Sequence, residues 1–398
     1  MSQIDRRQAL RLIAALGVAG SLPPALSACS SGSEQSAEEQ EAKDPIKVGM
    51  IVPQNGVNKS IGQEISNGFQ LYLRDHNGRL GNHPVNVVLV DEGETAASAK
   101  AAAEQLVKQQ IKILTGVSNA AALSAVRDVV ETGKIPLVSP APSLSDLANA
   151  TYVWRTGFVT DEPGRALGRW VADHSHGPVF VLAGEGVGVR EDVRAFVAAL
   201  KAAGGTTAGE PAFVVPGSKE FGTQLTALRA PTVGALFCAY TGAAGVEVVA
   251  RLRDAGLPKT LQIYGPGPLT EGTQLTQQGE AASGIFTAMN YAADLNTVDN
   301  RRFVSAYQKA YNAAPSSYAV ASYDAATVLD EALALAGADI RPLAVNGAIA
   351  KLGQVRSPRG EWQFNQTRSP LQKWFLRQVR ADGPVLANVL AAELVTLG

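Results

Sequence analysis

After Pro45 the sequence alternates short apolar runs with segments of helical periodicity, and this rhythm constrains the fold more than any single motif. The run Ile46–Val52 suits a buried strand, and apolar residues from Ile61 to Tyr72 then share one helical face that Asn77 and Gly78 would end. Further strands are expected at 85–90, 111–115, 135–139, 179–183, 212–215, 233–239 and 261–264. Further helices are expected at 96–109, 120–131, 164–174, 190–203, 221–228 and 245–255. Strands that alternate with helices predict an α/β fold with parallel sheets covered on both faces.

The pattern falls into two series, the second of which begins after Asp161. The chain after residue 45 is too long for one average core, so we expect two doubly wound lobes. A strand at 284–290 and long helices at 302–312 and 318–336 follow the second series. The segments 360–364 and 373–379, separated by turn-forming residues, predict a β-hairpin at the end of the chain.

The first 29 residues have the order of an export signal. Arg6, Arg7 and Arg11 supply positive charge, Leu10–Leu22 is the apolar stretch, and Leu26-Ser27-Ala28-Cys29 follows. This order resembles the bacterial lipoprotein signal, in which the cysteine is acylated after cleavage. We therefore expect a signal peptide at 1–28, lipid on Cys29 and an extracytoplasmic, membrane-anchored protein. An ordinary signal peptide with a nearby cysteine is the alternative.

The same region indicates two candidate export routes and a flexible segment after the signal peptide. Asp5–Arg11 resembles a twin-arginine signal, although Ala9 stands where a bulkier residue is usual, so the general route stays open as well. Residues 30–44 have alanine as their only apolar type and cannot bury enough surface to fold, which predicts a flexible tether at 29–45.

Composition excludes several classes of partner. Removing residues 1–28 takes away three arginines and one aspartate, which leaves 32 basic and 35 acidic residues and a net charge of −3. A nearly neutral chain argues against nucleic acid as a partner. No other apolar run is long enough to span a bilayer. If Cys29 carries lipid, Cys238 is alone and the chain has no internal disulfide.

Motifs for catalysis or metal binding are weak. Gly184, Gly186 and Gly188 follow an apolar strand but miss the full dinucleotide spacing, and His174 and His176 have no cysteine or histidine cluster around them. The pattern Gly-x-Ser-x-Gly is absent, and no acid–base set can be assembled. We therefore expect no enzyme, no cofactor and no metal.

Ligands of a doubly wound sheet bind beyond the carboxyl ends of its strands. Polar loops follow six of the expected strands and would form one cleft if two lobes faced each other. These loops are 53–60, 116–119, 139–145, 184–188, 240–242 and 265–268.

The order and spacing of several segments resemble the type I periplasmic binding proteins, in particular the leucine/isoleucine/valine-binding branch. The segments are Ile46–Pro53, Asp91 to Ser139–Ser143, Ala255–Pro258 and Ser322–Ala325, and the likeness covers about residues 46–380. It implies three crossings between lobes near Thr160, Met289 and Ser357, which act as a hinge. The N-terminal lobe would be 46–159 plus 290–357, and the C-terminal lobe 160–289 plus 358–398.

The resemblance also implies which loops hold the ligand. In this family, short hydroxyls and backbone amides of the first lobe hold the carboxylate of an amino acid, and Ser118-Asn119 and Ala141-Pro142-Ser143 align with those loops. Each hydrogen bond to a charged group contributes about 1.5–3 kcal/mol, so these donors suffice without a cation. The alternative is that these serines and prolines only form turns.

The second lobe departs from the family pattern. Gly267 stands where amino-acid binders offer a carboxylate to the ammonium group, and an ammonium buried without a counter-charge would cost several kcal/mol. Substitution by the nearby Glu185 or Glu271 is one alternative, and solvent exposure of both carboxylates is the other. Glycines and Val187 replace a tyrosine at 184–188, and Ile61 replaces a ring. Tyr240 and Thr241 remain as contacts on the lid. The candidate solute-contacting residues are therefore Ile61, Ser118, Asn119, Ala141, Pro142, Ser143, Tyr240, Thr241 and Gly267.

The resemblance implies a monomeric solute receptor that delivers its ligand to the permease of an ABC importer. Branched-chain amino acids are the family default, and a solute with a carboxylate or amide but no ammonium is the contender that Gly267 favours. A sensor or regulatory lipoprotein with the same fold and no permease is the alternative.

Overall fold

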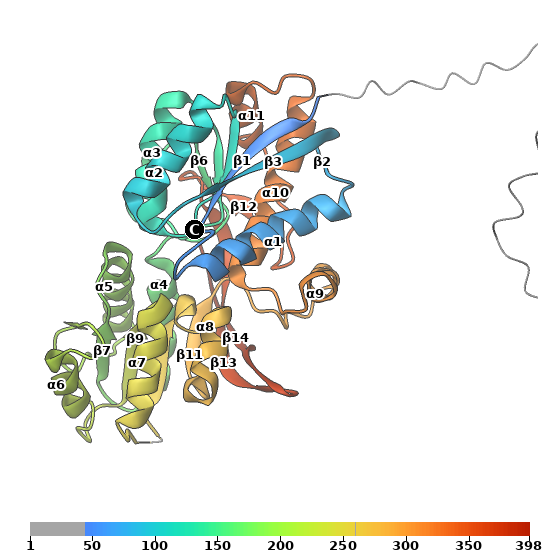
Figure 1. The fold of residues 1–398 in the computed structure, drawn as a ribbon. Coiled ribbons are helices and arrows are strands. Elements are labelled where there is room, and N and C mark those ends of the chain that lie inside the picture. Colours follow the sequence, from blue (N-terminus) through green and yellow to red (C-terminus); the bar gives the residue numbers. More distant parts are fainter. Residues whose placement is uncertain (1–43, 259) are drawn as a thin grey trace, which may run out of the picture. The chain divides into compact units, whose positions relative to one another are not determined.

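The first of two sheets lies in the N-terminal part of the fold. The computed structural model describes residues 44–258 and 260–398 (Figure 1). The first sheet has the strand order β2-β3-β1-β4-β5-β6, and β1 lies at its centre between β3 and β4, with Val48 opposite Val87 and Ile113. All its pairs are parallel except β2 with β3. Its strands are β1 (Ile46–Val52), β2 (Arg79–Leu80), β3 (His83–Asp91), β4 (Ile113–Gly116), β5 (Leu137–Ser139) and β6 (Val153–Arg155).

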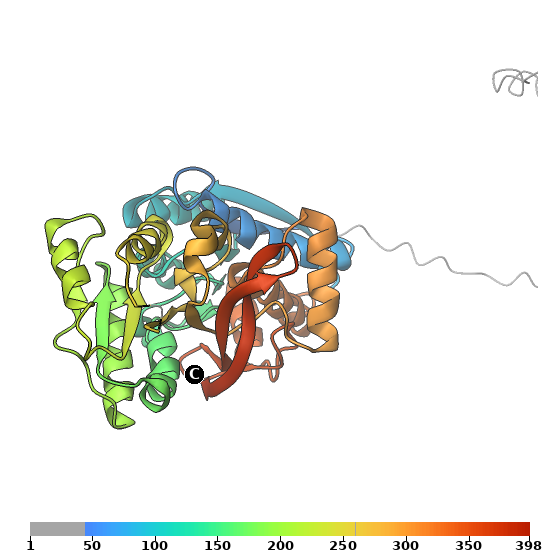
Figure 2. The ribbon, with the colours of Figure 1, turned by 90° about the horizontal axis from the view of Figure 1, so that it is seen from below.

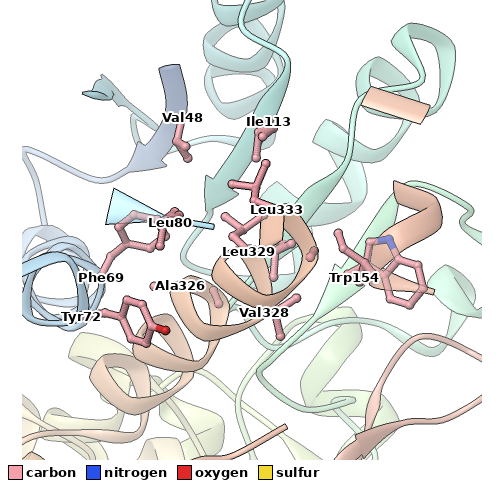
Figure 3. Close-up of a cluster of buried hydrophobic side chains, with 14 of the residues drawn as sticks. Val48, Phe69, Tyr72, Leu80, Ile113, Trp154, Ala326, Val328, Leu329 and Leu333 are labelled. Atoms are coloured by element: carbon pink, nitrogen blue, oxygen red, sulfur yellow. The ribbon is translucent and has the colours of Figure 1, made fainter. Parts of the chain in front are cut away.

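Helices cover both faces of the first sheet. One face packs against α1 (Lys59–Asp75), α10 (Ser317–Ala336) and α11 (Pro342–Ile349), and Figure 3 shows this cluster around Phe69, Leu329 and Trp154. The other face packs against α2 (Ala96–Lys108) and α3 (Ala120–Gly133). α1 and α10 approach closely at Gly68, where an added Cβ would lie 2.0 Å from the Ala319 carbonyl oxygen. α9 (Val298–Tyr311) joins a further cluster beside α1 and α10.

The second sheet has the order β12-β13-β11-β10-β9-β7-β8, with β14 paired to β13. β7 (Val179–Ala183), β8 (Ala212–Phe213), β9 (Ala235–Ala239), β10 (Gln262–Pro266) and β11 (Phe286–Met289) are parallel. One face packs against α4 (Glu162–His174) and α5 (Val187–Ala202), the other against α6 (Lys219–Ala227) and α7 (Gly242–Asp254). The short α8 (Thr273–Gln278) follows β10. The fold is therefore α/β with two lobes and two doubly wound sheets, as predicted.

The C-terminal end differs from the expected hairpin. β12 (Gln363–Phe364) pairs antiparallel with Pro370 and Leu371 at the start of β13 (Pro370–Asp382). The predicted second strand of the hairpin, 373–379, pairs instead with β11 and with the long strand β14 (Val385–Leu397). Figure 2 shows β13 and β14 as a long two-stranded ribbon. The sequence did not predict β14, because its half-buried alanines and leucines lack a clear alternation. β2, β6 and α11 were also missed.

One helix boundary matters for the binding site. The helix expected from residue 190 begins at Val187, after Gly186, whose positive φ of 131° a residue with a side chain rarely adopts. The earlier start places Gly188 and Asp192 four residues apart on one face of α5.

Among residues 44–258 and 260–398, no helix is both long and apolar enough to cross a membrane. Cys29, the expected signal peptide and most of the expected tether lie outside the described residues.

Candidate ligand-binding cavity

A cavity of about 320 Å³ lies at the carboxyl ends of strands from both sheets. Segments that follow β1, β4 and β5 in the first sheet form part of its wall, and segments that follow β7, β9 and β10 in the second sheet form the rest. All six loops expected from the sequence contribute to this wall. Its size lies at the lower end of the range for small-molecule sites.

Among the helices that begin near the cavity, three line it with their first residue. Ala120 and Ala121 of α3, Val187 and Gly188 of α5, and Gly242 of α7 line it. The first N–H groups of a helix have no acceptor inside the helix, and the aligned peptide dipoles make this end partly positive. The cavity therefore offers an electrostatic environment that favours a negatively charged group.

The remainder of the wall is mainly apolar. Phe158 and Tyr318 contribute rings, and Ile61, Pro142 and Val189 contribute aliphatic surface. The Phe158 ring packs edge-to-face on Trp374 with the ring centroids 5.6 Å apart, which fixes its orientation. Among the described residues that line the cavity there is no lysine, arginine or histidine.

Five of the nine candidate residues line the cavity, namely Ile61, Ser118, Asn119, Pro142 and Thr241. The other four, Ala141, Ser143, Tyr240 and Gly267, do not line it. The Ser143 hydroxyl and backbone N–H both donate to the Phe158 carbonyl oxygen, at 3.4 and 2.9 Å, and Ala141 is fully buried. Solute contact by any of the nine remains a prediction.

The two candidates of the second lobe that do not line the cavity are held by packing. The Tyr240 hydroxyl donates to the Val214 carbonyl oxygen at 2.8 Å, and its ring is buried in the core. A Cβ added to Gly267 would lie 2.3 Å from the Met289 sulfur. A carboxylate side chain at position 267 would therefore require the Met289 side chain to shift.

The polar groups of Ser118 and Asn119 are already bonded within the protein. Glu92, which is 1% exposed, accepts hydrogen bonds from the Ser118 N–H at 2.8 Å, the Ser118 hydroxyl at 2.7 Å and the Asn119 amide at 3.1 Å. The Asn119 oxygen caps α3 by accepting from the Ala122 N–H at 3.0 Å. Burial raises the pKa of Glu92 to about 7 despite these donors. An internal carboxylate therefore occupies the donors expected to hold a solute.

Two polar residues that the sequence analysis missed also line the cavity. Asp192 is 4% exposed, and its Oδ1 accepts from the Gly164 N–H at 2.6 Å, while Oδ2 has no partner among the described residues. Gln274 is 8% exposed, and its Oε1 also has no partner there. The signal that could have found Asp192 is its spacing of four residues from Gly188, but the expected helix began too late to show it.

Hydrogen bonds join the segments on either side of the cavity. The Ser145 hydroxyl, which follows β5, donates to Glu191 of α5 at 2.7 Å, and the Thr273 hydroxyl of α8 donates to Ser60 of α1 at 2.9 Å. The Ser317 N–H of α10 donates to Glu271, which precedes α8, at 2.6 Å. These contacts hold the two sides together around the cavity. No cluster of metal-ligating side chains occurs in the part of the chain that the structure describes.

Comparisons with curated proteins place the chain among binding proteins. The periplasmic binding protein family matches residues 45–384. Leu/Ile/Val-binding protein homolog 6 of Brucella melitensis is 29% identical over 294 residues, which cover 72% of this chain and 75% of the relative. Leu/Ile/Val-binding protein BraC3 of Rhizobium johnstonii is 24% identical over 330 residues, which cover 81% of this chain and 88% of the relative.

Solved structures show the same fold. A solute-binding protein of an ABC transporter from Rhodopseudomonas palustris BisB5, in complex with 3,4-dihydroxybenzoic acid, has a TM-score of 0.81 and 26% identity and covers 89% of this chain and 98% of its own. LivJ of Streptococcus pneumoniae, in complex with isoleucine, has a TM-score of 0.76 and 19% identity and covers 88% of this chain and 100% of its own. The chain therefore belongs to the periplasmic binding protein family, and it is a non-enzymatic solute-binding protein.

Proposed function

We propose that this chain is the extracytoplasmic solute-binding lipoprotein of an ABC importer and that it captures a small solute with an apolar body and a carboxylate or amide group. One observation carries the proposal. The cavity combines rings and aliphatic walls with three helix N-termini, and none of its described lining residues is cationic. Such a wall buries an apolar body and stabilises an anion through neutral dipoles.

The relatives support both parts of this ligand class. The Rhodopseudomonas palustris protein binds 3,4-dihydroxybenzoic acid, and a second protein from R. palustris was solved with benzoate. LivJ binds isoleucine. The rings of Phe158 and Tyr318 and the absence of an acidic side chain at Gly267 favour an aromatic carboxylate over an α-amino acid for this chain.

The proposal includes capture by closure of two lobes, 46–159 with 290–357 and 160–289 with 358–398, about crossings near Thr160, Met289 and Ser357. The bonds from Ser145 to Glu191 and from Thr273 to Ser60 support it, because they join opposite sides of the cavity. A solute that contacts both sides would favour the closed form by its differential affinity.

The proposal also includes lipid on Cys29, which rests on the order of residues in the signal region. Expression of Cys29→Ser in a bacterium that processes lipoproteins tests it. The variant should appear in the soluble extracytoplasmic fraction, whereas the wild-type chain should sediment with membranes. Equal sedimentation of the two chains would exclude Cys29 as the anchor.

A thermal-shift screen followed by titration calorimetry tests the ligand class. Benzoate and benzamide should raise the unfolding temperature, because a ligand that binds only the folded state stabilises it. Benzylamine, which has the same ring and a cationic end, is the matched control and should not. L-Isoleucine tests the family default. Stabilisation by benzylamine alone would contradict the proposed anion end.

A pair of variants tests the position of that end. Ala121→Asp places a carboxylate at the first turn of α3, where helices tolerate acids, and should weaken benzoate binding at least tenfold. Ala121→Asn, which is neutral and similar in size, should weaken it much less. Equal losses in both variants would indicate a steric effect and would remove α3 from the anion site.

A further inference from the structure

Asp192 is an unusual group for the wall of an apolar cavity. It lies on the second turn of α5, on the face that includes Gly188 and Val189, and all three line the cavity. The side chain is 4% exposed. Oδ1 is bonded to the Gly164 N–H of α4, and Oδ2 is bonded to no described residue. Burying a polar atom without a partner destabilises the folded state, so such atoms are uncommon.

The charged groups around Asp192 do not supply a cation. On α4, Arg165 is paired with Asp161 at 3.7 Å, and on α5, Arg190 is paired with Glu185 at 2.8 Å. β7 and β9, which also pack against α5, contain no charged residue. The other charged residues on the packed elements are Glu162, Arg169, Asp173 and His174 of α4, Glu191, Arg194 and Lys201 of α5, and Arg127, Asp128 and Glu131 of α3. Asp161 repels negative charge at Asp192.

These surroundings keep a proton on Asp192. Burial, which is the largest cause, and the Asp161 charge raise the pKa of Asp192 to about 8, although the Gly164 N–H opposes the shift. Since Oδ1 accepts the Gly164 N–H, the proton of the neutral acid belongs on Oδ2. At neutral pH the unbonded group that Asp192 holds in the cavity wall is therefore a donor.

We propose that Asp192 contacts the solute and presents its protonated Oδ2 as a hydrogen-bond donor, so that the pocket selects a solute with an oxygen acceptor at this wall. This inference rests on the proposed function, because it names a selecting residue in the same cavity. The acceptor is a carboxylate, amide or phenol oxygen. A solute that offers only an ammonium group has no acceptor for this donor.

Three variants test the role of Asp192, with benzoate and 4-hydroxybenzoate as the probes in calorimetry at pH 7. Asp192→Asn keeps an acceptor for the Gly164 N–H and a donor on the other side-chain atom. For the probe that binds the wild type more tightly, its dissociation constant should lie within about threefold of the wild-type value. Asp192→Leu removes the donor and should bind at least tenfold more weakly, about 1.4 kcal/mol. Glu162→Gln is the matched control. Glu162 of α4 is a buried acid like Asp192 but does not line the cavity, so this variant should bind both probes like the wild type.

The dependence of affinity on pH gives a second readout, in which Asp192→Asn serves as the comparison. Affinity should fall between pH 7 and pH 9 as Asp192 ionises, and Asp192→Asn should show no such fall. Binding at pH 7 should release no proton, which is measured in buffers of different ionisation enthalpy.

The outcomes separate this inference from the proposed function. Unchanged affinity in a folded Asp192→Leu, a pH profile shared by the wild type and Asp192→Asn, or release of about one proton on binding would each overturn the donor role alone. Failure of both probes to bind the wild type would overturn the proposed aromatic carboxylate class and this inference with it.

Discussion

The two walls of the cavity differ in whether their polar side chains are already hydrogen-bonded within the protein. On the first wall, the donors of Ser118 and Asn119 are bonded to Glu92. On the second wall, Asp192 Oδ2 and Gln274 Oε1 have no partner among the described residues. The donors of Ser118 and Asn119, which the sequence predicted to hold the solute, are satisfied by the protein itself, whereas the second wall holds two oxygens that the sequence did not point to and that have no partner among the described residues. The type of a residue at a strand end therefore does not show whether its hydrogen bonds are available to a ligand.

The difference between the walls has an electrostatic cause. Glu92 receives three donors and Asp192 receives one, and burial raises the pKa of both, to about 7 and about 8. Donors favour the ionised form of a carboxyl, whereas burial favours the neutral form. The hydrogen bonds therefore separate the two groups: Glu92 accepts three and organises the start of α3, whereas Asp192 in the cavity wall accepts one and keeps Oδ2 unbonded among the described residues.

The largest expected effect is the loss of the internal carboxylate. Glu92→Ala would leave the Ser118 N–H, the Ser118 hydroxyl and the Asn119 amide without an acceptor, and it should lower the free energy of unfolding by about 3 kcal/mol. Urea denaturation measures this. Glu92→Gln retains one acceptor oxygen and should lose about 1 kcal/mol. If Glu92→Ala were as stable as the wild type, the first wall would not depend on Glu92.

The next largest effect is a pH dependence of stability that differs between Glu92 and Asp192. Because each has a pKa above its ordinary value, the folded state keeps protons that the unfolded state releases, so stability falls as pH rises. For Glu92 this fall ends near pH 7, and for Asp192 near pH 8. We expect the urea midpoint of the wild type to fall between pH 4 and pH 9. Compared with the wild type, Glu92→Gln should show a smaller fall up to pH 7, and Asp192→Asn should show a smaller fall up to pH 8. Identical slopes in the wild type and both variants would show that neither carboxyl retains its proton.

The smallest effect tests whether Ser118 is free for a solute. Ser118→Ala removes one hydrogen bond to Glu92 and should cost about 1 kcal/mol of stability. Its affinity for benzoate should change by less than about twofold, which is about 0.4 kcal/mol by calorimetry. A tenfold loss would mean that the hydroxyl leaves Glu92 to contact the solute, and the contrast between the walls would no longer hold.

The local pattern predicted most of the fold. The strand 179–183 has the expected bounds, and α2 and α3 begin at the expected residues 96 and 120, because Thr95 and Asn119 cap them. The missed elements have weak local signals. β6 has three residues, and β14 is stabilised by its pairing with β13 rather than by its own alternation.

The sequence by itself determined the α/β class, the two series of elements and the six loops that meet at the cavity, because hydrophobic periodicity and caps are local properties. Only the tertiary structure decided which polar groups around the cavity are already hydrogen-bonded within the protein. Glu92 bonds to residues 26 and 27 positions away, and Asp192 is bonded across 28 positions to Gly164. Such bonds depend on packing between distant segments, so no local pattern reports that the donors of Ser118 are occupied or that Oδ2 of Asp192 is not.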